Sequence, residues 1–105
     1  AFPQSARARE AVGMVALGGG DAGAAVRELV HATELAPTNP RVWHERGVAE
    51  LSAERFADAR SSLHRATRLS PGSLPSWQAL EEACTRLPDA ACATTAREKA
   101  AELGR

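Results

Sequence analysis

Several absences narrow what this chain can be. No run of apolar residues approaches the roughly 18 to 20 that a membrane-spanning helix needs, so we expect no membrane insertion. The chain has no net charge, because 13 basic residues balance 13 acidic ones, and Lys99 is its only lysine. The arginines alternate with Glu and Asp along the sequence instead of forming a one-sided basic stripe. We therefore expect no binding to nucleic acid.

Motifs of catalysis and cofactor binding are also missing. The Gly18–Asp21 segment lacks the Lys-Ser/Thr end of a phosphate-binding loop and follows an expected helix, so it is predicted to be a turn. His31, His44 and His64 have no partner four residues away and no surrounding carboxylate pattern. No nucleophile elbow or catalytic carboxylate pair occurs. The sequence thus predicts no enzymatic activity, no cofactor and no metal site.

Cysteine is scarce, and the two residues present leave an alternative open. Seven residues separate Cys84 from Cys92, whereas a zinc knuckle has two to four. The pair flanks an expected turn between two helices, so a disulfide is feasible, since it needs Cα atoms within about 7 Å. Two buried, reduced thiols, which are common in helical cores, are the other interpretation and the one that the spacing favours. A bridge would indicate a periplasmic or secreted protein, and free thiols a cytoplasmic one.

The main positive feature is a repeat of 34 residues. The positions that recur are Ala25, Ala59 and Ala93; Ala32, Ala66 and Ala100; Leu35, Leu69 and Leu103; and the pairs Gly13 and Gly47, Pro37 and Pro71, Trp43 and Trp77. A unit of this length cannot bury its apolar face alone, so units stack side by side. This favours an interaction scaffold.

Apolar spacing and capping residues predict six helices. They are expected at about 6–17, 22–35, 40–53, 56–69, 74–87 and 90–103. Ser5, Asn39 and Ser73 are candidate N-caps that share the 34-residue spacing. No segment alternates with period two, so the fold class is all-α, and the short turns predict antiparallel hairpins. One domain over 1–105 is expected, with repeats at about 6–39, 40–73 and 74–105.

This pattern resembles the tetratricopeptide repeat. The second unit matches best, through Trp43, Gly47, Ala59, Leu63, Ala66 and Pro71. The first matches through Val12, Gly13, Ala25, Leu29, Ala32 and Pro37, and the third through Trp77, Leu80, Ala93 and Ala100. The resemblance implies an α-solenoid, a right-handed superhelix of three antiparallel helix hairpins. Members of the family bind peptides or protein partners in a concave groove lined by the first helix of each unit.

The resemblance also implies which residues line that groove. They are Arg7, Glu10, Met14 and Leu17 in the first unit; Arg41, His44, Glu45, Val48 and Leu51 in the second; and Gln78, Glu82, Thr85 and Arg86 in the third. The apolar centre between polar flanks favours an amphipathic helix or an extended peptide as ligand. Alternatively, Val48 and Leu51 pack between helices and leave no usable groove. His44 would contact a ligand or be solvated, whereas His31 and His64 are expected at the surface.

One subclass of the family grips the acidic C-terminal carboxylate of heat-shock chaperones with a clamp of Lys, Asn and Arg. The matching positions here hold Glu10, Met14, Glu45, Pro75 and Ala79. None is a clamp residue, and the charge of Glu10 would repel a carboxylate. We expect no binding of chaperone tails.

Departures from the repeat give further expectations. Arg9 stands where the other units have Trp43 and Trp77, and Arg97 and Arg105 replace the Leu and Pro of the repeat. End repeats need polar outer faces, so the array is expected to be complete at three units. Glu81 replaces the glycine of the first two units, which predicts a splayed third hairpin.

The first functional hypothesis is therefore a non-catalytic module that binds a partner protein's peptide or helix. The alternatives are an assembly module that self-associates through its ends or convex face, and a targeting domain of a larger enzyme. The Arg-rich, Lys-poor composition suggests a GC-rich, bacterial genome.

Overall fold

The computed structural model describes residues 5–104, and six helices account for most of them. The helices are α1 (Ala6–Gly18), α2 (Ala22–Leu35), α3 (Pro40–Ser52), α4 (Phe56–Leu69), α5 (Leu74–Arg86) and α6 (Ala90–Leu103). No strand occurs within this described part, so the predicted all-α class is confirmed. None of the helices described is long and apolar enough to cross a membrane.

Five of the six described helices begin at a residue whose side chain accepts a hydrogen bond from a free N–H group, and α4, which follows Arg55, is the exception. Ser5 Oγ accepts a hydrogen bond from the Ala8 N–H at 3.0 Å, and the side chains of Asn39 and Ser73 cap α3 and α5 in the same way. The predicted helix ends at residues 53 and 87 are each one residue too long, since Ala53 and Leu87 are the C-caps. The predicted end at residue 17 is one too short, and the turn after α1 uses Gly20 at a φ of +85°.

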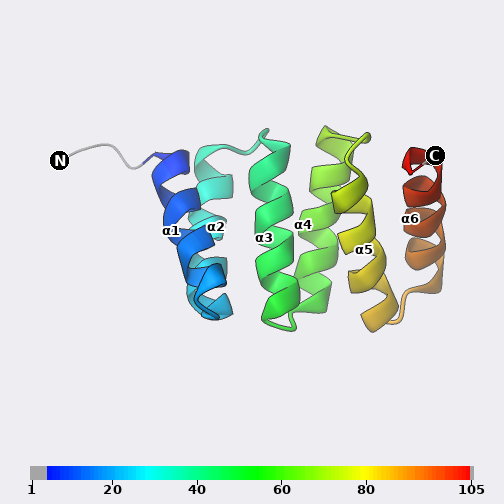
Figure 1. Cartoon of the computed structure of the whole chain (residues 1–105), viewed down its shortest axis with the longest axis horizontal. Coiled ribbons are helices and arrows are strands. Elements are labelled where there is room, and N and C mark those ends of the chain that lie inside the picture. Colours follow the sequence, from blue (N-terminus) through cyan, green and yellow to red (C-terminus); the bar gives the residue numbers. More distant parts are fainter. Residues whose placement is uncertain (1–4, 105) are drawn as a thin grey trace.

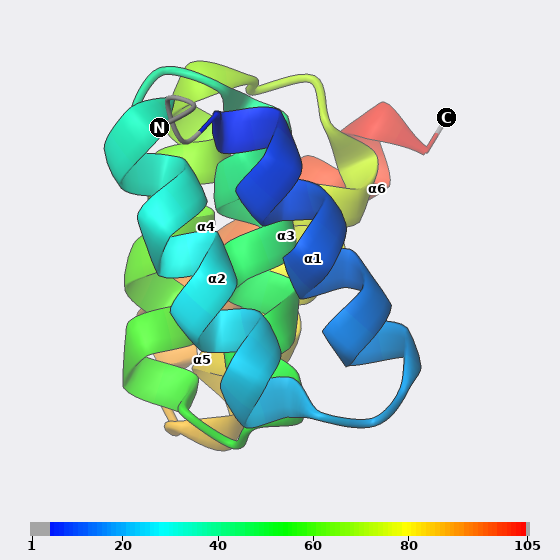
Figure 2. The same ribbon diagram turned by 90° about the vertical axis from the view of Figure 1, so that its left-hand side faces the viewer.

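The three hairpins lie side by side along the long axis of the molecule (Figure 1). Viewed along that axis, they stack one behind another (Figure 2). The first helices touch one another, α1 with α3 and α3 with α5, whereas the described residues of α2, α4 and α6 make no such contacts among themselves. The first helices therefore form the inner, concave layer. As predicted, the chain is a right-handed superhelix of three antiparallel helix hairpins.

The core consists of two clusters, each between successive repeats. One joins the first and second repeats around Leu29 and Val42, and the other joins the second and third around Leu63 and Leu80. The repeated alanines fill both clusters, because small side chains let the helices approach closely. The two repeated tryptophans make the same hydrogen bond. The Nε1–H of Trp43 and of Trp77 each donates to the carbonyl of the proline six residues earlier, at 2.8 Å.

The first two hairpins depend on a glycine that faces a leucine. A Cβ added to Gly13 would lie 2.9 Å from Leu29 Cγ, and one added to Gly47 would lie 2.5 Å from Leu63 Cγ. In the third hairpin Glu81 and Arg97 occupy these two positions and form an ion pair of 3.0 Å. The predicted splaying is wrong, because α5 and α6 pack about as closely as the other pairs. The glutamate reaches sideways to the arginine instead of separating the helices.

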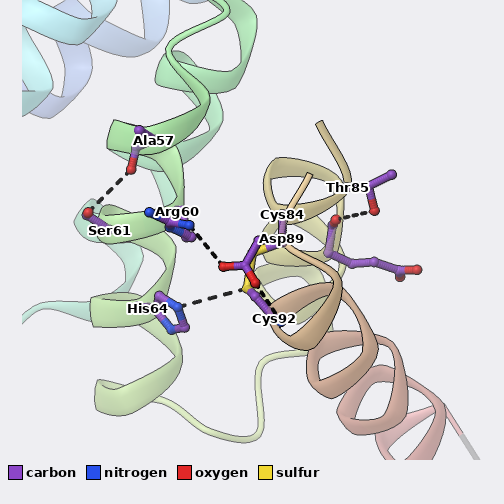
Figure 3. The surroundings of a disulfide bond; sticks show 9 residues. Ala57, Arg60, Ser61, His64, Cys84, Thr85, Asp89 and Cys92 are labelled. Carbon is purple, nitrogen blue, oxygen red and sulfur yellow. Dashed lines mark hydrogen bonds and ion pairs between the residues drawn. A yellow bond between two sulfur atoms is a disulfide. The ribbon is translucent and has the colours of Figure 1, made fainter. Parts of the chain in front are cut away.

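A disulfide between Cys84 and Cys92 also ties α5 to α6 (Figure 3). The Cα atoms are 5.7 Å apart, within the range that a bridge requires. The structure thus decides between the bridged and reduced states that the spacing left open.

The second repeat contains a buried polar network that sequence reasoning missed. Glu50 is almost fully buried, and it accepts hydrogen bonds from Ser62 Oγ and from Arg46 Nε, the latter at 3.3 Å. Arg46 Nη1 also donates to Thr33 Oγ1 of the preceding repeat at 2.9 Å. Burial raises the pKa of Glu50, and these donors act against that rise. The network satisfies polar groups at the interface between the first two repeats.

Candidate functional site

The predicted groove residues all lie on the first helices of the hairpins. Arg7, Glu10, Met14 and Leu17 belong to α1; Arg41, His44, Val48 and Leu51 to α3; and Gln78, Glu82 and Arg86 to α5. These helices form the concave layer, and the polar residues at the beginning of α3 connect the three repeats.

Arg41 connects α3 to α1. Its Nε and Nη2 donate to the two carboxylate oxygens of Glu10 at 2.7 and 3.0 Å, a bidentate ion pair. The guanidinium lowers the pKa of the Glu10 carboxyl, so Glu10 is ionised at neutral pH. This arrangement fixes two of the predicted groove residues to each other rather than leaving both free for a ligand.

Glu45 lies beside this ion pair in a far less favourable environment. Its Oε1 is buried without a hydrogen-bond partner and lies 3.9 Å from Arg41 Nε. Burial raises the pKa of Glu45 to about 8, and the adjacent Glu10 carboxylate adds to the rise. Glu45 is therefore mostly protonated at neutral pH, so the cluster of Glu10, Arg41 and Glu45 is close to neutral overall.

His44 connects α3 to α5. Its Nδ1 is 2.9 Å from Ser76 Oγ, and Ser73 Oγ donates to the same oxygen at 3.1 Å. Burial lowers the pKa of His44, so the imidazole is neutral at neutral pH. The expectation of a solvated histidine is wrong, because the side chain is half-buried against the next repeat.

A cavity of about 280 Å³ opens next to these contacts, at the beginnings of α3 and α5. Its lining residues are Pro40, Arg41, His44, Ser70, Ser73, Pro75 and Ser76. Only Arg41 and His44 were predicted as site residues. The others come from the turn between the second and third repeats and from the first turns of the two helices. The N-cap pattern could have indicated these additional lining residues. A groove residue in the first turn of a helix lies next to the N-cap and to the turn that precedes it.

The apolar residues of the concave layer divide between core and surface. Leu17 and Leu51 are half-buried and pack against the two core clusters, as the alternative interpretation of Leu51 expected. Val48 is half-buried, and Met14 is 39% exposed. Met14 is thus the most exposed of these four apolar side chains, and Val48 is a half-buried one that belongs to neither core cluster.

The residues of α5 are more dispersed. Gln78, Glu82 and Arg86 are exposed. The guanidinium of Arg86 lies over the ring of Phe56 at 5.2 Å, and Thr85 Oγ1 donates to the Glu81 carbonyl within its own helix. Arg86 is thus directed toward the beginning of α4. His31 and His64 are exposed, as predicted.

Comparison with known proteins identifies the fold. No protein-family model matches the sequence, and a search of curated proteins finds no match. Among solved structures, the first TPR domain of Spaghetti (RPAP3), bound to the HSP90 peptide SRMEEVD, is 21% identical with a TM-score of 0.84, over 98% of this chain and 84% of that one. A MamA mutant is 24% identical with a TM-score of 0.89, over 97% of this chain and 56% of that one.

The TPR domain of Sgt2 from Aspergillus fumigatus is similar too, at 23% identity and a TM-score of 0.86, over 98% of this chain and 72% of that one. At such identities these likenesses establish the fold alone. The chain has the tetratricopeptide-repeat fold, with three helix-hairpin repeats.

Proposed function

We propose that this chain is a non-catalytic protein-interaction module whose concave face binds a peptide or a helix of a partner protein. One observation carries the proposal: α1, α3 and α5 contact one another in a continuous layer across all three repeats, and partly exposed apolar side chains lie between polar groups on it. Such a layer offers shape and anchor contacts to a ligand, without requiring any reaction.

The chemistry of this face indicates what it would bind. Met14 and Val48 provide apolar contact area for one or two anchoring side chains of a ligand. The cavity at the beginnings of α3 and α5 is lined in part by Ser73, Ser76 and His44, whose hydroxyl and imidazole groups can exchange hydrogen bonds with a backbone or a neutral polar side chain. An extended peptide with an apolar anchor and an uncharged polar neighbour would match both features.

An acidic C-terminal tail does not match them. The RPAP3 domain was solved with the HSP90 peptide SRMEEVD, which ends in acidic residues and a carboxylate. In this chain the ionised Glu10 and the buried Glu45 occupy the corresponding part of the concave face. A tail carboxylate would find no free cation there, because the guanidinium of Arg41 is already paired with Glu10.

A peptide selection with matched variants tests the proposal. The parent chain is immobilised and panned against a peptide library, beside a Met14→Glu, Val48→Glu variant and a Val15→Glu control. Val15 lies on α1 but is 77% exposed, so its replacement adds the same charge while disturbing little packing. Circular dichroism first establishes that all three are folded. SRMEEVD serves as a peptide that should not bind.

We expect enriched peptides to bind the parent and the Val15→Glu control equally. Their affinity for the double variant should be at least tenfold lower, which corresponds to a loss of about 1.4 kcal/mol in binding free energy. Equal binding to all three proteins would contradict the proposal and move the site to another face. Tight binding of SRMEEVD would contradict the proposed ligand chemistry.

A second candidate function is self-association, which one observation favours. Val12 and Val15 on α1 are 54% and 77% exposed, although Arg46 and Leu80, the equivalents of Val12 in the next repeats, pack inside the array. Exposed apolar side chains on the surface of α1 suit contact with another copy. Analytical ultracentrifugation would show a mass that rises with concentration and a monomer for Val15→Glu. A concentration-independent monomer would reject this function.

A further inference from the structure

Side chains able to bind a metal ion surround the disulfide. The sulfur atoms of Cys84 and Cys92 and a carboxylate oxygen of Asp89 all lie within 4.8 Å of one another. The Nε2 of His64 is 3.9 Å from Cys92 Sγ. Figure 3 shows His64 reaching from α4, and Asp89 from the turn before α6, toward the two sulfurs. Cys84, Asp89 and Cys92 thus gather their donor atoms in one cluster, and His64 approaches this cluster from α4 at Cys92.

One pair of donors, His64 and Cys92, already has the spacing of a tetrahedral zinc site, and His64 would move closer to the other donors when the ion binds. With Zn–S bonds of about 2.3 Å and Zn–N bonds of about 2.0 to 2.1 Å, neighbouring ligand atoms lie about 3.5 to 3.8 Å apart. The separation of 3.9 Å between His64 and Cys92 is already close to this value. Opening the disulfide would let the two sulfurs separate to the same distance, and their Cα atoms, 5.7 Å apart, leave room for that movement.

We propose that reduction of the disulfide creates a binding site for Zn²⁺ formed by Cys84, Cys92, His64 and Asp89. In the oxidised chain the sulfurs are bonded to each other and cannot bind the ion. In the reduced chain the ion would replace the disulfide as the link between α5 and α6, and His64 would add a link to α4. The third repeat would then have two alternative cross-links, selected by redox conditions.

The electrostatics around the cluster suit this ligand set. Two thiolates and a carboxylate would leave the Zn²⁺ site with one negative charge, and Arg60, at 2.9 Å from Asp89 Oδ2, balances it. Asp89 Oδ1 accepts a hydrogen bond from the Cys92 N–H at 3.2 Å, yet each carboxylate oxygen keeps a lone pair for a metal. Cys92 lies in the first turn of α6, where the helix N-terminus stabilises a negative sulfur.

The sequence spacing gave no hint of this site because the zinc-knuckle rule assumes ligands within one short loop. Here the two cysteines face each other across a helix hairpin, and His64 comes from the preceding repeat. Only the packing of α4 beside α5 brings the histidine to the sulfurs.

A trialkylphosphine can serve as the reductant that converts the disulfide into two thiols. The phosphine attacks one sulfur and the S–S bond breaks. Water then supplies the oxygen of the phosphine oxide, and its two hydrogens protonate the two sulfurs. Phosphorus is oxidised by two electrons and the disulfide is reduced by two. Binding of Zn²⁺ afterwards releases both thiol protons to solvent.

Cobalt spectroscopy tests the site directly. The phosphine-treated chain, freed of reductant under argon, is titrated with Co²⁺ and then with Zn²⁺ as competitor. Thiolate-to-cobalt charge-transfer absorption and intense tetrahedral ligand-field bands are the readout. The oxidised chain is titrated in parallel, as are reduced Cys92→Ser, His64→Ala and His31→Ala. Far-ultraviolet circular dichroism before and after metal addition reports on the fold of each.

We expect one Co²⁺ per reduced chain, displaced by Zn²⁺, and no charge-transfer band with the oxidised chain. Affinity should fall at least about tenfold in His64→Ala and about a hundredfold in Cys92→Ser, and stay within twofold in His31→Ala, the exposed control on α2. Absence of the charge-transfer band in the reduced parent would overturn the proposal. So would equal affinity of the parent and His64→Ala, or equal cobalt binding by the oxidised chain.

Discussion

The first two hairpins and the third hairpin reach the same packing by different chemistry. In the first two, a glycine on one helix lets a fully buried leucine of the other fit against it, Gly13 with Leu29 and Gly47 with Leu63. In the third, the equivalent residues are charged and pair at the surface, and a disulfide joins the helices nearby. Close approach of two helices can thus be held by shape or by a covalent bond with an ion pair.

The two types of hairpin also differ in how deeply the paired residues are buried. Leu29 and Leu63 also belong to clusters shared with the following repeat, so they are buried from both directions. The side chain of Arg97 is 62% exposed. A leucine there would bury little apolar area, and its contribution to stability would be correspondingly small. Three changes to the hairpins test this difference, from the largest expected effect to the smallest, and a fourth change tests the concave layer.

Truncation of the paired residue should separate the two types of hairpin most clearly. Leu63→Ala removes a fully buried side chain from the cluster between the second and third repeats, so we expect a loss of about 3 kcal/mol in the free energy of unfolding. Arg97→Ala at the equivalent position should cost less than about 0.5 kcal/mol, because its ion pair is exposed. Urea denaturation measures both. Similar losses would show that the two positions contribute equally to their hairpins.

Loss of the disulfide should weaken the third hairpin alone. A loop of this length gives about 2.5 kcal/mol of stabilisation in the chain-entropy treatment, so the Cys84→Ala, Cys92→Ala variant should lose about that amount. Hydrogen exchange should accelerate mainly in α5 and α6. The control is reductant with a chelator, which should lower the stability of the parent but not of the variant. Unchanged stability of the reduced parent would mean that the ion pair and the core suffice.

Replacing the packed glycines with alanine should lower the stability of the fold more where the added Cβ lies closer to the facing leucine. Gly47→Ala places a Cβ 2.5 Å from Leu63 Cγ, so the crowding should exceed the gain in helix propensity and cost about 1 kcal/mol net. Gly13→Ala, with its nearest contact at 2.9 Å, should be close to neutral. Thermal unfolding of the pair provides the measurement. Stabilisation of both by about 1 kcal/mol would show that neither glycine is needed for close packing.

The smallest expected effect concerns pH and the concave layer. Because the pKa of Glu45 is raised to about 8 in the folded chain, its contribution to stability is complete below about pH 4.5 and is lost as pH rises through about 8. Glu45→Gln should therefore match the parent at pH 4 and exceed it at pH 9 by about 1 kcal/mol, after allowance for solvent screening. Denaturation curves at the two pH values give the comparison. A constant difference would mean that Glu45 is ionised throughout.

Much of this architecture was accessible from the sequence, because repeat spacing and capping are local signals. Asn39, Pro40 and Ser73 fixed the helix starts, and the 34-residue spacing fixed which helices pair. The compensation in the third hairpin was also visible in principle, since Glu81 and Arg97 both depart from the repeat within one unit. To interpret these two departures as an ion pair, one must know that the two positions face each other, and the spacing along separate helices does not reveal that.

The site was less predictable, because contacts between repeats decide it. Glu50 and His44 look like surface residues in a helical pattern. In the structure neighbouring helices cover both side chains, and Ser62 hydrogen-bonds to Glu50 while Ser76 hydrogen-bonds to His44. The pairing of Arg41 with Glu10 depends on side chains 31 residues apart meeting across two helices. Such polar links follow no periodic rule, whereas the apolar stripe does. The sequence therefore predicted the concave face but not which of its residues remain free.

The most direct test of the central proposal is nuclear magnetic resonance mapping of the isotopically labelled chain with a peptide enriched in the selection. Binding at the concave face should shift the amide signals around Met14, His44, Val48 and Ser76 on α1, α3 and α5, while α2, α4 and α6 stay nearly unchanged. Shifts concentrated on α2, α4 and α6, or confined to the α1 surface around Val12 and Val15, would contradict the concave-face account.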